Sequence, residues 1–539
     1  MIRMFCALIV FCFLGFLAII AQEGESSHKE ETIETHAEKV TDGKHEKTDD
    51  HAKHGDTAHD DHSHHAPGAY HLDGKGVSLW WCLPFIGILL SIALFPLVAP
   101  HFWHHHYGKI SLTWGLIFLI PFAIWGNGGH DSFNTTMFYI LEVYILEFIP
   151  FIVLLMSLFA VTGGIALTGT LRGSPKVNTI LLGIGVLIAS WMGTTGAAML
   201  LIRPVLKANA WRKKKVHVVV FFIFLVANIG GSLTPLGDPP LFLGFLKGVS
   251  FFWTTTALLV PYLITSAILL SIFFVVDKYF YNKEEAPPFD GEKEPLGVQG
   301  LHNFILLAGV VGAVVLSGVW KSKIIDPVTG KEIVENILLD LSGLGYAVKM
   351  SYGQSVMIIL LVIITVISML TTKKSIRELN GFTWEPILEV AKLFATIFIT
   401  MVPAIAILKA GEAGALKAVI NSVMKDGQPV NEMFFWCAGI LSSFLDNAPT
   451  YVVFFETASG DAVKLMGEMK HTLAAISMGA VFMGANTYIG NAPNFMVKAI
   501  AEESGVKMPS FFGYMAWSLI FLIPTFMFLT LIKAWTFSL

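Results

Sequence analysis

Charged residues are scarce in this sequence. They make up 14 % of the 539 residues, whereas hydrophobic residues make up 54 %. This balance excludes an ordinary soluble globular protein and places the chain among polytopic membrane proteins, with the lipid bilayer as its expected partner. The formal net charge is only -4, and no basic stripe of the kind that nucleic acid requires is present. A nucleic-acid partner is therefore not expected.

Cysteine and familiar catalytic motifs are also rare or missing. The chain has four cysteines, and neither a CxxC pair nor a regular spacing joins them, which excludes a disulfide framework and a thiolate metal site. No HExxH or GxSxG motif occurs, and no histidine is paired with a serine inside an apolar segment. We therefore expect no enzyme and no cofactor.

The N-terminal region combines a leader with a polar segment. Residues 1–21 have one arginine, an apolar core and a small residue at Ala21, which is typical of a signal peptide or of an uncleaved anchor. Residues 22–77 are acidic and carry ten of the 18 histidines. With almost no apolar side chains to form a core, this segment is predicted to be disordered and exported, with a metal-collecting or pH-sensing tail as the alternative.

From residue 78 onward, apolar runs of membrane-spanning length alternate with short polar connections. Two further apolar segments, 178–206 and 431–456, contain polar, glycine or proline breaks and are interpreted as re-entrant hairpins. With the His-rich segment outside, the cluster Arg212–Lys215 falls on the inside, which requires 178–206 to be a hairpin. The outer loops 320–352 and 409–430 carry several lysines, which weakens this charge rule without reversing it. The ten candidate spans are 78–98, 109–126, 138–163, 216–245, 251–276, 301–319, 353–370, 386–410, 470–498 and 511–536.

Two pairs of motifs recur at one spacing. "SWMGTTGA" at Ser190 and "SFLDNAPT" at Ser443 are offset by 253 residues, and "GSLTPLGDPPLF" at Gly231 and "GANTYIGNAPNF" at Gly484 have the same offset of 253. Five spans and one hairpin in each half would invert the second half relative to the first. We predict an all-α membrane fold of two inverted repeats, as in secondary transporters, with broken helices meeting at the midplane. The predicted divisions are residues 78–276 and 301–539 for the repeats and 277–300 for a cytoplasmic linker.

The stretch "GGSLTPLGDPPLFLGF" predicts a broken helix with a function. Pro235, Pro239 and Pro240 remove amide donors and uncover carbonyl groups. Backbone of this kind is tolerated at membrane depth only where it is buried in protein or lines a watery cavity. A structural kink is the alternative, but a kink requires neither Asp238 nor a second copy of the motif.

Each half contributes one carboxylate, because Gly193 corresponds to Asp446 and Asp238 corresponds to Asn491. The surrounding side chains are neutral and rich in oxygen, without lysine or arginine, which suits a small hard cation. A cation and a proton would compete for these aspartates, with Asp446 predicted to be the more direct ligand. The expected site comprises Asp446, Asp238, Asn447, Thr450, Ser443, Thr194, Thr195, Thr234, Ser232, Asn491, Thr487, Asn486 and Asn494.

The motifs "SFLDNAPTYVVFF", "SWMGTTGAAMLLIRP" and "GGSLTPLGDPPLFLGFLKGV" resemble those of the NhaD-type sodium/proton antiporters. These antiporters lie in the ion-transporter superfamily that also holds arsenite pumps and dicarboxylate and citrate carriers. The resemblance implies a bacterial inner-membrane protein that exports Na⁺ or Li⁺ in exchange for H⁺, with Na⁺ at Asp446 and Asp238. The superfamily also suggests a homodimer. The His-rich segment is not part of the family pattern, and its predicted export places it in the periplasm.

Alternatives remain for the function and for other acidic residues. Within the superfamily, the rival function is that of an anion carrier for arsenite or carboxylates, and a channel is a further alternative. Glu142 and Glu147 are five residues apart, so they share a helix face poorly, and they are candidates for a proton relay or for packing. Glu456 is predicted to be solvated near the outer surface.

Overall fold

The computed structural model describes the chain from residue 70 to residue 537 with internal gaps. The described residues are 70, 72–126, 131–285, 294–320, 323–325, 332–334, 339–341, 346 and 348–537. All of them belong to the second of two units, Tyr70–Leu539. The predicted leader 1–21 and nearly all of the His-rich segment lie outside the described residues.

The last residues of the predicted tail pack against the helical unit. Leu72 and Val77 are buried, and the backbone N–H of Leu72 donates to the hydroxyl of Tyr139 over 3.1 Å. Gly74 approaches the backbone of Ala406 so closely that a side chain would not fit there. The polar composition of 22–77 ends in a few apolar residues, and burial of their side chains accounts for the packing of residues 72–77 against the helices.

The unit is mostly helical, and apolar side chains are exposed on its outer helices. Leu112 on α3 is 61 % exposed and Leu370 on α12 is 81 % exposed, as expected for surfaces that face lipid. In the described residues, eight helices are long and apolar enough to cross a membrane. They are η1 and α2 (Leu79–Cys82 and Leu83–Val98), α3 (Pro100–Trp125), α4, η2 and α5 (Ser132–Val143, Tyr144–Phe148 and Ile149–Thr162), α6 (Pro175–Met192), α10 (Trp253–Tyr281), α11 (His302–Val319), α12 (Tyr352–Thr371) and α22 (Phe511–Leu531).

Three of the ten predicted spans are broken, and breaks were expected in two of them, 216–245 and 470–498. Residues 216–245 divide into α8 (Val216–Leu225), η3 (Ile229–Gly231) and α9 (Pro239–Leu246). Residues 470–498 divide into α20 (Lys470–Met483), η6 (Gly484–Asn486) and α21 (Ala492–Glu503). The third, α14 (Glu385–Thr400) with α15 (Val402–Lys409), is bent by 40° and raises the number of candidate spans to nine if it is counted as one. Prolines near the starts of α9, α21 and α15 account for these positions.

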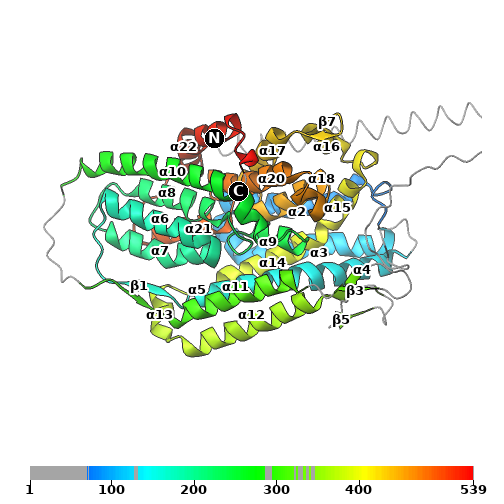
Figure 1. The fold of residues 1–539 in the computed structure, drawn as a ribbon, viewed down its shortest axis with the longest axis horizontal. Helices are drawn as coiled ribbons and strands as arrows, with labels where there is room; N and C mark the ends of the chain where they lie inside the picture. The colour runs from blue at the N-terminus through cyan, green and yellow to red at the C-terminus, as the bar shows by residue number, and fades with distance from the viewer. Residues whose placement is uncertain are drawn as a thin grey trace, which may run out of the picture. The chain divides into compact units, whose positions relative to one another are not determined.

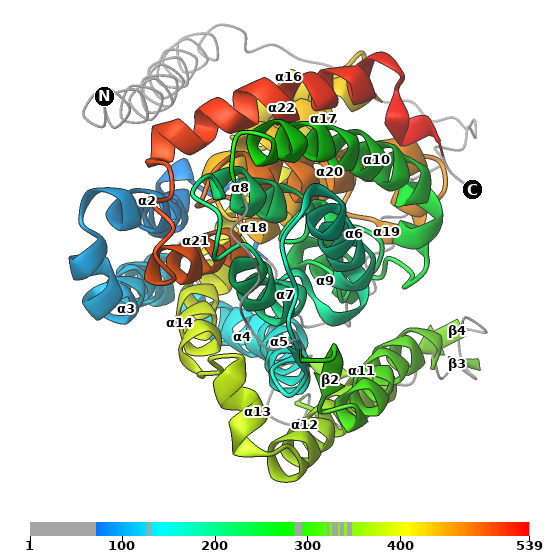
Figure 2. The same ribbon diagram turned by 90° about the vertical axis from the view of Figure 1, so that its left-hand side faces the viewer.

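The same sequence of elements occurs in both halves of the described chain. The first half contains α6, α7 (Thr194–Ala208), α8, α9 and α10 in that order, and the second half contains α17 (Asn431–Phe444), α18 (Asn447–Ala458), α20, α21 and α22. Within each half the first two helices pack against each other. Figures 1 and 2 show α8 and α20 towards the middle of the unit, and every residue of both helices except Val216, Lys470 and His471 is buried. Helices that are apolar on all sides are expected in such a position.

The remaining elements connect or flank these helices. Helices α11 and α12 lie side by side (Figure 1), and α10 lies beside α22 (Figure 2). Helix α10 continues through Tyr281, so its last turn extends into the predicted linker 277–300. The short helices are α13 (Lys374–Leu379), η5 (Gly411–Ala413), α16 (Lys417–Val423), α19 (Ala462–Met466) and η7 (Ala534–Thr536). The antiparallel strand pairs are β1–β2 (Ala166–Thr168, Gly297–Gln299), β3–β4 (Lys323–Ile325, Glu332–Val334), β5–β6 (Leu339–Asp340, Lys349–Met350) and β7–β8 (Met424–Lys425, Gln428–Pro429).

Candidate cation site at the broken helices

Asp238 lies at the break between α8 and α9, directly before the first residue of α9. Pro239 and Pro240 follow it, and proline has no backbone N–H to which a capping side chain could bond. The Asp238 side chain accordingly makes no hydrogen bond to the start of its own helix, and the residue is 1 % exposed. Its buried carboxylate is therefore available to groups from other elements.

Three side chains from three other helix starts donate hydrogen bonds to this carboxylate. Thr194 Oγ1 donates to Oδ1 over 3.2 Å, and Asn491 Nδ2 donates to the same oxygen over 3.0 Å. Asn447 Nδ2 donates to Oδ2. Thr194 begins α7, Asn447 begins α18 and Asn491 directly precedes α21. The starts of α7, α9, α18 and α21 thus meet at one carboxylate.

The junction between α6 and α7 is held against the same break. Gly193 has a φ of +80°, a conformation that glycine adopts without strain, and it lets α7 begin directly after α6. The backbone N–H of Thr194 donates to the carbonyl of Gly237 over 2.9 Å. A Cβ on Gly237 would lie 2.0 Å from the carbonyl oxygen of Gly231. The close approach of these backbones explains why small residues occupy the break.

A pair of threonines shapes the two breaks in the same way. Thr234 Oγ1 donates to the carbonyl of Ser190 and accepts from the N–H of Leu236. In the other half, Thr487 Oγ1 donates to the carbonyl of Ser443 and accepts from the next residue but one, Ile489. Thr234 therefore fixes the first break to the end of α6, and Thr487 fixes the second break to the end of α17. The hydrogen bonds of these two side chains go to backbone groups.

Two buried amide oxygens near the breaks have no hydrogen-bond partner. They are Oδ1 of Asn447 and Oδ1 of Asn486, and Asn447 is the residue whose amide group donates to Asp238. An unpaired buried acceptor costs about 1–3 kcal/mol, and a bound cation would supply the missing partner. Among the ion pairs of the described residues, none joins Asp238 or Asp446 to a lysine or arginine. This chemistry fits a small cation with oxygen ligands.

The remaining predicted site residues have local partners. Asp446 directly precedes α18, and its Oδ1 accepts from the N–H of Ala448 over 3.0 Å. Thr450 donates to the carbonyl of Asp446 over 3.0 Å, and Ser232 donates to the carbonyl of Ile229. Asn486 Nδ2 donates to Ser443 Oγ over 2.9 Å, and Thr195 is partly buried. The structure thus gathers Asp238, Thr194, Asn447 and Asn491, whereas Asp446, Thr450 and Ser232 bond to the backbone of their own segments.

The sequence interpretation missed Asn228. Its Oδ1 accepts from Asn491 over 3.2 Å, and its Nδ2 donates to Oδ1 of Asn494 over 2.7 Å. Asn494 in turn donates to the carbonyls of Gly484 and Thr487. Asn228 thus joins the two broken helices. In the sequence, this residue could have been recognised as a single amide near the end of the apolar run "VHVVVFFIFLVANIGG".

Glu142 and Glu147 lie apart from this site, on the span formed by α4, η2 and α5. Residues 144–148 form a π-helix, closed by a bond from the N–H of Ile149 to the carbonyl of Tyr144. Residues five apart lie on nearly the same side of such a turn, so Glu142 and Glu147 come closer to one face than α-helical spacing predicts. Glu147 lies 3.6 Å from Nζ of Lys247.

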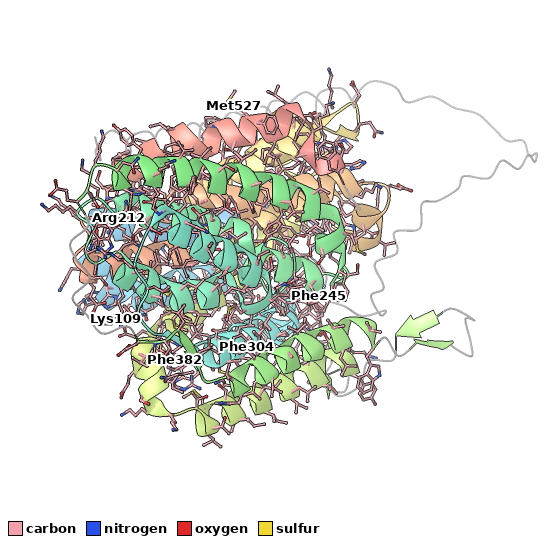
Figure 3. All side chains as sticks on the ribbon, turned by 60° about the vertical axis from the view of Figure 1, so that its left-hand side comes forward. Lys109, Arg212, Phe245, Phe304, Phe382 and Met527 are labelled. Atoms are coloured by element: carbon pink, nitrogen blue, oxygen red, sulfur yellow. The ribbon has the colours of Figure 1, made fainter. Side chains whose placement is uncertain are left out.

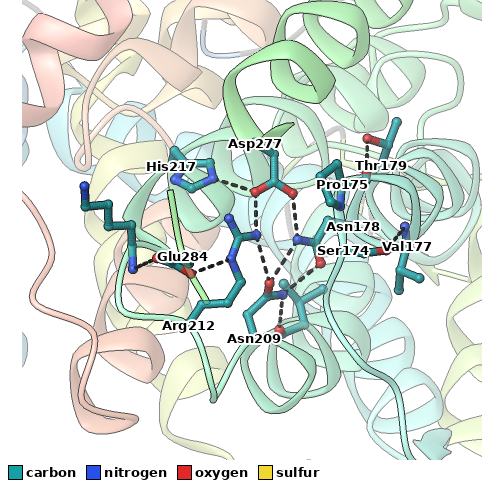
Figure 4. A network of polar contacts seen from close by, with 12 residues as sticks. Ser174, Pro175, Val177, Asn178, Thr179, Asn209, Arg212, His217, Asp277 and Glu284 are labelled. Atoms are coloured by element: carbon teal, nitrogen blue, oxygen red, sulfur yellow. Dashed lines mark hydrogen bonds and ion pairs between the residues drawn. The ribbon is translucent and has the colours of Figure 1, made fainter. Parts of the chain in front are cut away.

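A second buried polar network joins the ends of α6, α7, α8 and α10 (Figure 4). Asp277 is fully buried, and its Oδ1 accepts from Nη1 of Arg212 and lies 2.8 Å from Nε2 of His217. Asn178 donates to the other oxygen of Asp277 over 2.8 Å and to Asn209 over 2.9 Å. The predicted inside cluster Arg212–Lys215 therefore begins with a buried residue that ties helix ends together.

Across the parts of the chain that the structure describes, no group of three or more His, Cys, Asp or Glu side chains could hold a metal ion.

Residues 74–534 match the model of a family described as "Putative citrate transport".

The chain belongs to this citrate transport family. The family is part of the ion-transporter superfamily, and together with the apolar helices it identifies a multi-pass membrane protein. No curated protein matches the chain. Of the two functions that the sequence suggested, the citrate transport family favours the anion carrier over sodium/proton exchange.

Proposed function

We propose that this chain is a cation-coupled secondary transporter whose central site binds Na⁺ at Asp238. The observation that carries the proposal is the buried carboxylate of Asp238, which accepts bonds from Thr194, Asn447 and Asn491 and pairs with no basic side chain in the described residues. The unpaired Oδ1 of Asn447 provides a further ligand beside it. An ionisable group in this position is functional by default.

For the transported substrate, the description of the family supports a carboxylate such as citrate as the first candidate. The starts of α7, α9, α18 and α21 converge at the site, and helix N-termini attract anions. In transporters with broken helices, these N-termini receive anionic substrate groups while uncovered carbonyls coordinate Na⁺. Na⁺ would then neutralise Asp238 and allow a carboxylate to approach. The first candidate function is therefore cation-coupled carboxylate transport.

A second candidate, exchange of Na⁺ for H⁺, is favoured by the charge of the site. Asp238 and Asp446 bring two carboxylates, and no lysine or arginine of the described chain pairs with them. A proton and a cation could occupy the aspartates in turn, and an empty charged site would cross the membrane at a cost of several kcal/mol. The resemblance of the motifs to NhaD-type antiporters supports this candidate.

We also propose that the two halves are inverted repeats, each with one re-entrant hairpin, α6–α7 and α17–α18. The recurring element order and the matching roles of Thr234 and Thr487 support this arrangement. It would place the Arg212 network on the cytoplasmic side and the His-rich segment in the periplasm of a bacterial inner membrane. A homodimer and the absence of enzymatic activity are parts of the same proposal.

Transport by purified protein in liposomes tests these functions directly. Uptake of radiolabelled citrate that requires an inward Na⁺ gradient would support the first candidate. Dissipation of a pH gradient by Na⁺ without citrate would support the second. Liposomes without protein and a K⁺ gradient serve as controls. Transport that proceeds equally with Na⁺, Li⁺ or neither ion would overturn the cation-coupled proposal.

A further inference from the structure

Helices α9 and α18 are joined at both of their ends. They pack against each other, and at one end Asn447 donates to Asp238. At the other end, Lys247 directly follows α9, and its Nζ lies 2.9 Å from Oε1 of Glu456 on α18. One helix pair therefore carries the cation site at one end and an ion pair at the other.

Between the two ends, the helices are in close contact. A Cβ on Gly244 of α9 would lie 2.4 Å from the hydroxyl oxygen of Tyr451 on α18. Tyr451 is 1 % exposed. Such close packing transmits a displacement of one helix to the other rather than absorbing it. A change at Lys247 is therefore expected to reach Asp238.

The ion pair at the far end is buried. The side chain of Glu456 is 2 % exposed and that of Lys247 is 16 % exposed, which corrects the expectation that Glu456 is solvated. Oε2 of Glu456 has no hydrogen-bond partner. Because removing charges from water costs more than such a pair returns in many proteins, net stability is a weak explanation for it.

The same lysine also contacts a third element. Glu147 Oε1 lies 3.6 Å from Nζ of Lys247, and its side chain is 27 % exposed. Glu147 lies on the π-helix η2, within the long span Ser132–Thr162, and belongs to neither α9 nor α18. One ammonium group is thus shared between a buried carboxylate on α18 and a more exposed carboxylate on a separate span.

Lys247 lies at the other end of the helices from the Arg212 network. Figure 3 shows Phe245, two residues before Lys247, at one end of the helical unit and Arg212 at the opposite end. The α9–α18 pair therefore connects the central site to the end of the unit that would face the periplasm in the proposed orientation. A contact at this end can therefore form or separate according to which side of the membrane the site faces.

We propose that Lys247 is a positioning residue for the cation site, held permanently by Glu456 and exchangeably by Glu147. The pair Lys247–Glu456 keeps α9 and α18 together as one body, so that Asp238 and Asn447 stay in contact. The pair Lys247–Glu147 holds that body against the span α4–η2–α5 in one transport state and separates in the other. This inference rests on the proposed cation binding at Asp238.

Substitutions distinguish the two ion pairs by their effects on the kinetics of transport. Glu456→Gln is expected to raise the Na⁺ concentration for half-maximal transport about tenfold, as for a typical coupling between sites. Lys247→Met should do the same, and Lys247→Arg should restore the wild-type value. Glu147→Gln should leave this concentration unchanged and alter the maximal rate. Lys498→Met removes an ion pair with Glu502 on α21, whose side chains are 21 % and 42 % exposed, and is the matched control, with no change expected. Equal effects of Glu147→Gln and Glu456→Gln on the Na⁺ requirement would overturn the proposal.

Cross-linking tests the same idea by a readout that does not depend on the Na⁺ requirement. Cysteines would be placed at 247 and 456, or at 247 and 147, after removal of the four native cysteines, and linked with Hg²⁺. Transport should survive the 247–456 link and stop with the 247–147 link, and a thiol should restore it. A 247–147 link that permits full transport would contradict the exchangeable contact. If transport by the protein without cross-links does not depend on Na⁺, the cation site at Asp238 is refuted instead. The effect of each cross-link can still be measured with any substrate that the protein transports, so the two failures are distinguishable.

Discussion

Asn491 donates a hydrogen bond to Asp238 over 3.0 Å, and these two residues are 253 positions apart in the chain. This separation equals the offset between the two pairs of sequence motifs. Corresponding residues of the two halves therefore touch each other, and one is a carboxylate whereas the other is an amide. A carboxylate paired with an amide can bind one monovalent cation, whereas two carboxylates at this distance would repel each other.

Gly237→Ala should destabilise the protein because a Cβ there would lie 2.0 Å from the carbonyl oxygen of Gly231. Overpacking of this kind costs about 1–3 kcal/mol. We expect a lower apparent melting temperature in detergent and weaker Na⁺ dependence of transport. Gly312→Ala in α11 is the control, since nothing lies within 4 Å of that position. A Gly237→Ala protein as stable and as active as the parent would contradict the close packing of the break.

Arg212→Met should lower the free energy of unfolding by about 3–5 kcal/mol, because it leaves the buried carboxylate of Asp277 without its cationic partner. The exposed neighbour Lys213 provides the control, and Lys213→Met should change stability by less than about 0.5 kcal/mol. Thermal unfolding of the purified variants measures both. Similar melting temperatures for the two variants would show that the network contributes little.

Cysteines at Lys213 and Lys425 should react with an impermeant thiol reagent from opposite sides of the membrane. Both positions are exposed, and the inverted-repeat proposal places Lys213 in the cytoplasm and Lys425 in the periplasm. The measurement compares labelling in intact cells with labelling in everted vesicles. Labelling of both cysteines from one side would rule out the inverted arrangement.

Deletion of residues 22–70 should leave transport unchanged if the leader is kept. A segment with so few apolar side chains cannot form part of a buried site. The comparison requires equal amounts of the two proteins in the membrane, measured by immunoblotting. If the shortened protein is inserted normally but transports nothing, the His-rich segment has a direct role in transport.

The position of the central break could be predicted from local sequence, because Pro239 and Pro240 restrict the backbone wherever they occur. The offset of the motifs also indicated that Asp238 and Asn491 correspond. The sequence did not indicate which of the two aspartates receives more hydrogen bonds from other helices. The structure surrounds Asp238 with three donors, whereas Asp446 accepts from the backbone of its own helix.

Contacts between distant residues could not be predicted from one sequence. Lys247 and Glu456 are 209 residues apart, and no local pattern reveals that a glutamate near a helix end will be buried by a lysine from the other half. Glu142 and Glu147 were judged by α-helical periodicity, which fails where a π-helix adds a residue to the turn. The motifs that begin at Gly231 and Gly484 predicted breaks after α8 and α20, but apolar composition alone does not show that these helices end at Leu225 and Met483.

Equilibrium binding of ²²Na⁺ to purified protein tests the central claim most directly. Wild-type protein should bind Na⁺ in competition with Li⁺, and Asp238→Asn should lose this binding while keeping its melting temperature. The double substitution Asp238→Asn with Asn491→Asp moves the carboxylate across one hydrogen bond and should restore part of the binding. Unchanged ²²Na⁺ binding by Asp238→Asn would contradict a cation site at Asp238.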